Sequence, residues 1–399
     1  MIERNLADSL REAAALYPVV TVTGPRQSGK TTLSRAVFPR KPYVSLEPLD
    51  VRGRAVNDPR GLLAQYRDGA IFDEVQHAPD LLGYLQEEVD QRPDPGRFVL
   101  TASHHLALSV AVAQSLAGRT AVLQLLPPSL DELRRFDAPP EGLFPTLLAG
   151  AYPRIHDRGV PPDRWLADYV ATYVQRDVRQ LLAIADLTTF TTFLRLAAGR
   201  TAQELNLSSL ADDVGVAHNT IRSWISVLEA GYIVFRVPAW HRNRGKRLVK
   251  APKLHWFDSG LVCHLLGIRD ADQLRHHPLR GAIFESWVAA EITKAHLHRA
   301  RPADLHHLRQ SRGLEVDLLV QDGRTLRAVE CKSGATVRAD AFAPLRRAAS
   351  LLRDSGDADT VETLLVHGGA ADHTQDGVRV LPWSALAGLD WTAPPDSTG

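Results

Sequence analysis

The sequence predicts an α/β protein whose first domain carries a phosphate-binding loop on a parallel sheet. Short β-rich segments alternate with longer helical segments over residues 1–150, a pattern typical of a parallel sheet covered by helices. The first of these strands leads directly into GPRQSGKT, and a later strand ends in two acids. The chain has 399 residues, so at roughly 150 residues per domain we expect two or three domains.

The elements of the first domain can be assigned in order along the chain. Val19–Thr23 (VVTVT) is rich in β-branched residues and predicts the first strand. The elements expected after it are a helix at Lys30–Val37, strands at Tyr43–Leu46, Ala70–Phe72 and Phe98–Thr101, and a helix at Asp80–Asp90 between the last two strands.

The segment GPRQSGKT matches the phosphate-loop pattern G-x-x-x-x-G-K-[ST] and lies between a strand and a helix, which makes the match specific. Backbone N–H groups of such a loop, together with the start of the next helix, bind phosphate oxygens. We expect Lys30 to reach the β and γ phosphates, Thr31 to ligate Mg²⁺ and Thr32 to line the neighbouring phosphate region. The predicted nucleotide-binding residues are Gly24, Pro25, Arg26, Gln27, Ser28, Gly29, Lys30, Thr31 and Thr32.

A second part of the nucleotide site is predicted at GAIFDE, residues 69–74. An apolar strand that ends in acids is common and usually marks a solvated strand end. After a complete phosphate loop, however, Asp73 is expected to hold Mg²⁺ and Glu74 to polarise the attacking water. Glu74 and Lys30 are therefore the expected catalytic residues for nucleotide hydrolysis.

Composition limits the remaining classes of function. The 47 Lys and Arg residues balance 46 Asp and Glu residues, for a net charge of +1, so only a local patch could hold a polyanion. Two cysteines, Cys263 and Cys331, are too few for a disulfide framework or a four-cysteine zinc site. Without a signal-peptide pattern or a run of about 18 apolar residues, we expect a cytoplasmic protein that does not contact membrane.

The middle of the chain predicts helices followed by a helix-turn-helix. Apolar residues recur at helical spacing from Asp163 to about Arg200, and residues 208–228 read as helix, glycine-containing turn and helix. Residues 236–253 then carry seven Lys or Arg and no acid, as expected for a basic wing. DNA contact and a protein-packing role both remain open. The candidate reading residues at the start of the second helix are His218, Asn219, Thr220 and Arg222.

The C-terminal region contains acids and a lysine at a spacing that can hold a metal ion. Asp317 lies near the start of one predicted strand, and Glu330 and Lys332 share a face of the next. With Glu285 from a helix, these carboxylates could bind Mg²⁺ or Mn²⁺ while Lys332 activates water to cut a phosphodiester. The alternative is a structural cluster in which Lys332 neutralises the acids. Cys331 should face the opposite side of its strand, in the core.

Several segments together resemble one family. GPRQSGKT, IFDEVQ, RFVLTAS, residues 115–133, GAYPRI and residues 169–181 are similar to an AAA+-type family of bacterial and archaeal ATP-binding proteins that ends in a PD-(D/E)xK nuclease-like domain. The resemblance implies ATP as the nucleotide and Ser103 as the sensor of the γ phosphate. It also implies that Arg119 and Arg176 act as sensor or trans-acting arginines, although either could be a simple ion-pair residue. A trans-acting arginine would require a homo-oligomer.

The sequence therefore predicts an α/β chain of five parts: an AAA+-like ATPase core at 1–150, a helical lid at 151–200, a winged helix at 201–262, a restriction-endonuclease-like domain at 275–390 and a flexible tail at 391–399. The expected function is ATP hydrolysis coupled to a nuclease-like module that acts on or binds DNA. The alternative is a nucleotide-gated DNA- or protein-binding regulator with an inactive nuclease fold.

Overall fold

The computed structural model describes residues 2–103, 115–174, 186–241, 251–310, 313–354 and 358–392. The chain forms two compact units. The first comprises Met1–Pro128, Ala230–Tyr232 and Leu297–Arg301, and the second comprises Ser129–Glu229, Ile233–His296 and Pro302–Gly399.

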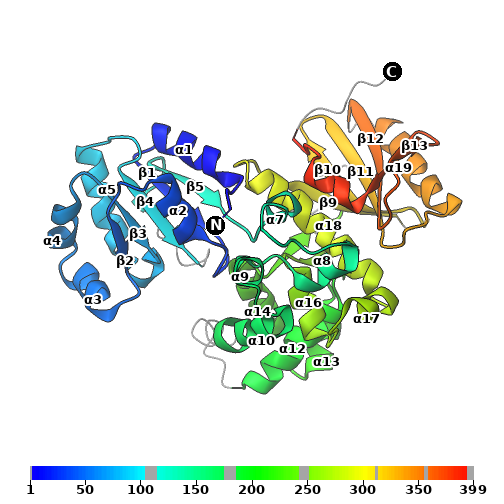
Figure 1. Ribbon diagram of the computed structural model, residues 1–399, viewed down its shortest axis with the longest axis horizontal. Helices are drawn as coiled ribbons and strands as arrows, with labels where there is room; N and C mark the ends of the chain where they lie inside the picture. The colour runs from blue at the N-terminus through cyan, green and yellow to red at the C-terminus, as the bar shows by residue number, and fades with distance from the viewer. Residues whose placement is uncertain are drawn as a thin grey trace. The chain divides into compact units, whose positions relative to one another are not determined.

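The first unit contains a five-stranded parallel sheet in the order β2-β3-β4-β1-β5, coloured blue to cyan in Figure 1. Its strands are β1 (Val19–Thr23), β2 (Tyr43–Ser45), β3 (Ala70–Asp73), β4 (Phe98–Ala102) and β5 (Thr120–Gln124). The parallel arrangement was predicted, and it brings the carboxyl ends of β1, β3 and β4 to one edge.

Helices cover both faces of this sheet. The side chains of each strand alternate between the faces, so apolar residues are presented on both. Val20 and Val22 of β1 pack in one apolar cluster with α1 and α2, whereas Val19 packs in another with α3, α4 and α5. These helices are α1 (Leu6–Leu16), α2 (Lys30–Val37), α3 (Leu49–Asn57), α4 (Pro59–Leu63) and α5 (Leu81–Gln91), with 3₁₀ turns at Ala64–Tyr66 and Val75–His77.

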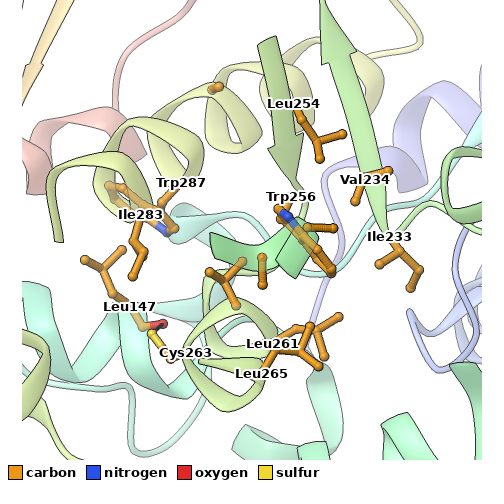
Figure 2. Packing of buried hydrophobic residues seen from close by; sticks show 14 of the residues in the cluster. Leu147, Ile233, Val234, Leu254, Trp256, Leu261, Cys263, Leu265, Ile283 and Trp287 are labelled. Atoms are coloured by element: carbon orange, nitrogen blue, oxygen red, sulfur yellow. Dashed lines mark hydrogen bonds between the residues drawn. The ribbon is translucent and has the colours of Figure 1, made fainter. Parts of the chain in front are cut away.

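The second unit is built on helices that share one large core. Leu261, Cys263 and Leu265 of α16 lie in this core with Leu147 of α8 and Trp256 of β8 (Figure 2). The helices are α7 (Leu130–Leu133), α8 (Leu143–Ala149), α9 (Pro153–Arg158), α10 (Pro162–Tyr169) with a π-helical turn at Val170–Val174, α12 (Leu187–Gly199), α13 (Leu207–Val214), α14 (His218–Ala230), α16 (Ser259–Leu265), α17 (Ala271–His276), α18 (Arg280–Leu297) and α19 (Phe342–Asp354).

The predicted helix-turn-helix corresponds to α13 and α14. Asn206 caps α13 by accepting a hydrogen bond from the Ser209 N–H, and Gly215, in the left-handed region, ends it. A small antiparallel sheet in the order β6-β8-β7 follows, with β6 (Gln203–Glu204), β7 (Val234–Val237) and β8 (Lys253–Trp256). The basic RNRGKR segment, residues 242–247, lies outside the described residues.

A six-stranded mixed sheet forms the C-terminal part of the second unit, in the order β13-β14-β12-β11-β10-β9 (Figure 1). Val329 and Cys331 of β11 pack toward the core that contains α18, and Leu326 and Ala328 pack toward α19. Cys331 therefore lies in the core, as predicted. The strands are β9 (Asp304–Arg309), β10 (Glu315–Asp322), β11 (Thr325–Lys332), β12 (Thr360–His367), β13 (His373–Gln375) and β14 (Val378–Pro382), and 3₁₀ turns occupy Ala339–Ala341 and Trp383–Ala387.

One predicted boundary is wrong at its first residue. Trp391, assigned from sequence to a flexible tail at 391–399, is fully buried in the large core of the second unit. Its carbonyl oxygen accepts a hydrogen bond of 2.8 Å from the Arg327 guanidinium. The burial of this large aromatic side chain anchors the end of the domain.

Candidate functional site

The phosphate loop connects the end of β1 to the start of α2, as predicted. Gly24 has a φ of +150°, and a Cβ added there would lie 2.0 Å from the Leu125 carbonyl oxygen, so only glycine fits. Gly29 has a φ of +97° and immediately precedes α2. Both glycines of the motif are therefore required by the backbone path.

Lys30 lies folded against this loop. Its Nζ donates hydrogen bonds to the carbonyl oxygens of Gly24 (3.0 Å) and Pro25 (2.8 Å), and the side chain is buried. Burial lowers the pKa of Lys30 to about 8, although the nearby carboxylates of Glu74 and Asp73 oppose the shift. The ammonium is thus held beside the backbone that would receive the phosphates.

Asp73, at the end of β3, accepts hydrogen bonds from three hydroxyl groups. Thr31 Oγ1 and Tyr43 Oη are each 2.8 Å from its carboxylate oxygens, and Thr101 Oγ1 donates to the same carboxylate. A threonine hydroxyl beside an aspartate carboxylate is the donor set that Mg²⁺ takes in phosphate-loop ATPases. The residues present therefore fit the predicted role of Thr31 and Asp73.

Glu74 follows Asp73 with a φ of 58°, an unusual value for a residue with a side chain. Ser103 Oγ donates to its Oε1 at 2.6 Å, and Gln76 Nε2 donates to Oε2. Burial alone would raise the pKa of Glu74, but the Lys30 charge and these hydrogen bonds outweigh it and lower the pKa. Glu74 is therefore ionised at neutral pH, as a base toward water must be, and Ser103 contacts it directly.

Arg119 does not belong to this site in its own chain. It immediately precedes β5, and its carbonyl oxygen accepts a hydrogen bond from the N–H of Val19, the first residue of β1. The side chain pairs with Asp90 at 2.5 and 2.9 Å. Because the phosphate loop follows the last residue of β1, Arg119 lies at the opposite edge of the sheet, and a sensor role within the same chain is ruled out. Arg176 lies outside the described residues.

Other residues support the loop and were not predicted. Arg4 is buried and donates to the carbonyl oxygens of Ser28 (2.7 Å) and Leu126 (2.8 Å). Tyr232 Oη donates to Thr23 Oγ1 at 2.8 Å. Thr101 had a usable signal, because it lies near the carboxyl end of a predicted strand neighbouring Asp73. Arg4 and Tyr232 had none, because their partners are far away in the sequence.

The second predicted site gathers acids in the C-terminal part of the second unit. Lys332 Nζ lies 2.6 Å from Glu330 Oε1, so the two side chains share a face of β11, as predicted. Asp317 of β10 accepts a hydrogen bond of 2.8 Å from the Cys331 N–H. Burial raises the pKa of Glu330 to about 7, and the Asp317 charge adds to this shift.

Lys253 contributes a cation that the sequence did not predict at this site. From the start of β8, its Nζ lies 2.9 Å from Glu285 Oε1, 3.5 Å from Glu315 Oε1 and 4.0 Å from Asp317 Oδ1. Only 5% of its side chain is exposed. Burial disfavours the charge, but the carboxylates more than compensate and raise the pKa of Lys253 above its usual value.

The predicted metal set of Glu285, Asp317 and Glu330 is not arranged as a metal centre. Across the described parts of the chain, no three or more His, Cys, Asp or Glu side chains are grouped in a way that could hold a metal ion. The physical reason lies in the two lysines, since Lys253 pairs with Glu285 and lies near Asp317 while Lys332 pairs with Glu330.

The helix-turn-helix presents some of the predicted reading residues. At the start of α14, Asn219 and Arg222 are exposed and His218 and Thr220 are partly exposed. The two ends of the predicted basic wing are already paired with acids, because Arg236 contacts Glu229 at 2.5 Å and Lys253 contacts Glu285 at 2.9 Å. Residues 242–250 between them lie outside the described residues.

The fold and the nucleotide site define a P-loop ATPase of the AAA type. An AAA-domain model matches residues 16–134, and two domains of unknown function, DUF8612 and DUF4143, match residues 141–272 and 280–386. The chain belongs to the same family as the uncharacterized proteins Mb2031c of Mycobacterium bovis and Rv2008c of Mycobacterium tuberculosis. Each is 31% identical to it over 322 residues, covering 80% of this chain and 71% of the relative.

Two solved structures show a partial likeness to this chain at low sequence identity. The Walker-type ATPase PABY2304 of Pyrococcus abyssi is 15% identical, with a TM-score of 0.43, and the match covers 66% of this chain and 96% of that one. AMPPCP-bound DnaA of Aquifex aeolicus is 14% identical, with a TM-score of 0.29 and coverage of 56% and 85%. Among the described helices, none is long and apolar enough to cross a bilayer.

Proposed function

We propose that this protein hydrolyses ATP with Mg²⁺ at the phosphate loop and couples the cycle to DNA binding through α14. The observation that carries the ATPase part is the convergence of Lys30, Thr31, Asp73, Glu74 and Ser103 at one edge of the parallel sheet. These side chains come from three different segments, and each matches a step of phosphoryl transfer.

Each residue has a distinct task in this proposal. Bound Mg²⁺ neutralises phosphate charge, and Thr31 and Asp73 would hold it. Lys30 would exchange its two loop carbonyls for phosphate oxygens. Glu74, kept ionised by Lys30, Ser103 and Gln76, would accept a hydrogen bond from the attacking water and orient it. Ser103 would connect this base to the γ phosphate, so that hydrolysis changes the hydrogen bonding of Glu74.

Substitutions at Lys30 and Glu74 test the ATPase proposal. We expect Lys30→Ala to abolish ATP hydrolysis, and Glu74→Gln to retain ATP binding but to lower kcat by about 10²–10⁴-fold, because it removes the base. Lys41→Ala is the matched control, since Lys41 precedes β2 and donates to the Arg97 carbonyl oxygen away from the loop. Phosphate release from the purified proteins is the measurement, and unchanged turnover in Lys30→Ala would contradict the proposal.

DNA binding is supported by the exposed start of α14, where Asn219 and Arg222 project while Ile221 and Trp224 are buried. Asn and Arg can both read base edges. We expect the double variant Asn219→Ala/Arg222→Ala to weaken binding of duplex DNA by about 1–3 kcal/mol per lost base contact. The exposed Arg347→Ala on α19 is the control. Fluorescence anisotropy at two salt concentrations measures both, and binding that is insensitive to salt and to the double variant would count against the proposal.

A nuclease activity and a purely regulatory role remain two forms of this proposal. The nuclease form rests on the residue types at Asp317, Glu330 and Lys332 and requires these acids to leave their lysine partners for a metal ion. The position of Lys253 among the acids supports binding without cleavage. Incubation of the protein with plasmid DNA, Mn²⁺ and ATP separates the two. Nicking that is lost in Asp317→Ala supports the nuclease, and salt-sensitive binding without nicking supports the regulator.

A further inference from the structure

The acidic cluster of the second unit, defined here as Glu285, Glu315 and Asp317, contains a cation that the chain itself provides. Lys253 Nζ lies within 2.9–4.0 Å of an oxygen from each of the three carboxylates. Glu285 comes from α18, the other two acids come from β10, and Lys253 comes from β8. One ammonium group on β8 thus contacts side chains from two other elements.

Ionised carboxylates that are buried together repel one another strongly away from water, so either a proton or a positive charge between them must relieve the repulsion. Glu285 and Asp317 are largely buried, with 12% and 14% of their side chains exposed. The second lysine nearby, Lys332, pairs with Glu330 at 2.6 Å and is 44% exposed. Lys253 is the more deeply buried of the two lysines and serves the acidic cluster.

The backbone of Lys253 is fixed on both sides. Lys253 pairs with Glu204 of β6 and with Val237 of β7, so it lies in the central strand of the small sheet. Central strands hydrogen-bond to two neighbours and are harder to displace than edge strands. The ammonium therefore has a backbone anchor that keeps it in the acidic cluster.

We propose that Lys253 is the resident cation of the acidic cluster and excludes divalent metal from it, so that Mg²⁺ or Mn²⁺ binds there only when this ammonium is removed. This inference deepens the regulatory form of the proposed function and rests on it, since it gives the reason why the nuclease-like site would not cut DNA. A metal ion and an ammonium at the same carboxylate oxygens are mutually exclusive on both steric and electrostatic grounds.

The test measures Mn²⁺ binding to the full chain without nucleotide or DNA. Electron paramagnetic resonance reports the concentration of free Mn²⁺. We expect Lys253→Met, whose side chain has a similar length and no charge, to bind Mn²⁺ at a site that the wild type lacks. Adding Asp317→Asn to Lys253→Met should remove the gain. Lys253→Arg keeps the positive charge and should bind no more Mn²⁺ than the wild type.

Two outcomes would overturn the proposal. The first is Mn²⁺ binding by the wild-type protein that the Asp317→Asn substitution abolishes. This comparison does not depend on the folding of any Lys253 variant. The other is a folded Lys253→Met protein, as judged by circular dichroism, with no added affinity for Mn²⁺. ATP hydrolysis and DNA binding measured on the same samples report on the proposed function separately, because neither assay depends on metal in the acidic cluster.

Discussion

Lys30 is the residue of the nucleotide site whose charge is most sensitive to pH. Its contacts in the structure are backbone carbonyls, which accept hydrogen bonds from its ammonium but carry no full charge. Burial therefore lowers its pKa toward neutrality despite the nearby acids. A phosphate group would supply the charge that the carbonyls lack, so nucleotide binding and protonation of Lys30 should be linked.

This linkage predicts a pH dependence of nucleotide affinity. The charged form binds phosphate, and the pKa of Lys30 before binding is about 8, so affinity is constant well below this pH and falls as the pH rises through it. We expect binding to be about tenfold weaker at pH 9 than at pH 7, with uptake of a proton at the higher pH only. Calorimetry in buffers of different ionisation enthalpy measures both quantities, and equal affinity at the two pH values would refute the link.

At the residue scale, the sequence predicts the groups that act within a local motif. Two short patterns predict Lys30, Thr31, Asp73 and Glu74. The ends of their strands place these residues without help from distant parts of the sequence. Lys253 looks like part of a basic segment, and only the fold brings it to Glu285, 32 residues later. Contacts of this kind depend on how elements pack, and no local pattern records them.

Asp258 shows how single side chains hold elements together in the second unit. It caps α16 by accepting from the Leu261 N–H at 2.8 Å, and its other oxygen accepts from the Ala151 N–H at 2.7 Å, in the turn between α8 and α9. The side chain is buried, and burial raises its pKa. One carboxylate thus satisfies two buried N–H groups from separate elements.

We expect Asp258→Ala to lower the free energy of unfolding by about 2–3 kcal/mol, because it removes a cap and leaves the Ala151 N–H without its acceptor. Asp270 is the matched control. It caps α17 through the Gln273 N–H at 2.8 Å but is exposed, so Asp270→Ala should cost about 1 kcal/mol. Chemical denaturation of both variants measures the difference, and equal losses would show that the bond to Ala151 contributes nothing.

At the element scale, apolar strands and long helices are predictable and polar strands are not. β1 and α2 coincide with the predicted ranges. β1 is a run of β-branched residues, and the phosphate-loop motif fixes the start of α2. β5 (TAVLQ) was not predicted: its apolar run is only three residues long, and Leu123 alone is buried. β9 (DLHHLR) is polar in sequence, although His306 and His307 are buried in the structure. These strands are held by pairing with their neighbours, which single-sequence periodicity does not reveal.

At the scale of the whole molecule, the P-loop ATPase was predictable because a phosphate loop, an acidic strand end and alternating elements all point to the same fold. The division into units was less accessible. Residues 230–232 and 297–301 belong to the first unit although the chain around them belongs to the second. Their amino-acid composition gives no signal of this, because each segment is only a few residues long.

Tyr232 and His298 show why these two short segments matter for the nucleotide site. It donates to Thr23, next to the phosphate loop, and His298 likewise accepts from the Leu126 N–H at 3.2 Å. A gene fragment cut at the end of the AAA-domain match, residue 134, would encode the whole nucleotide motif and yet omit both partners. The AAA-domain match therefore ends before the nucleotide-binding unit is complete. A fragment that covers this unit needs Tyr232 and His298 as well, because they complete its hydrogen bonds.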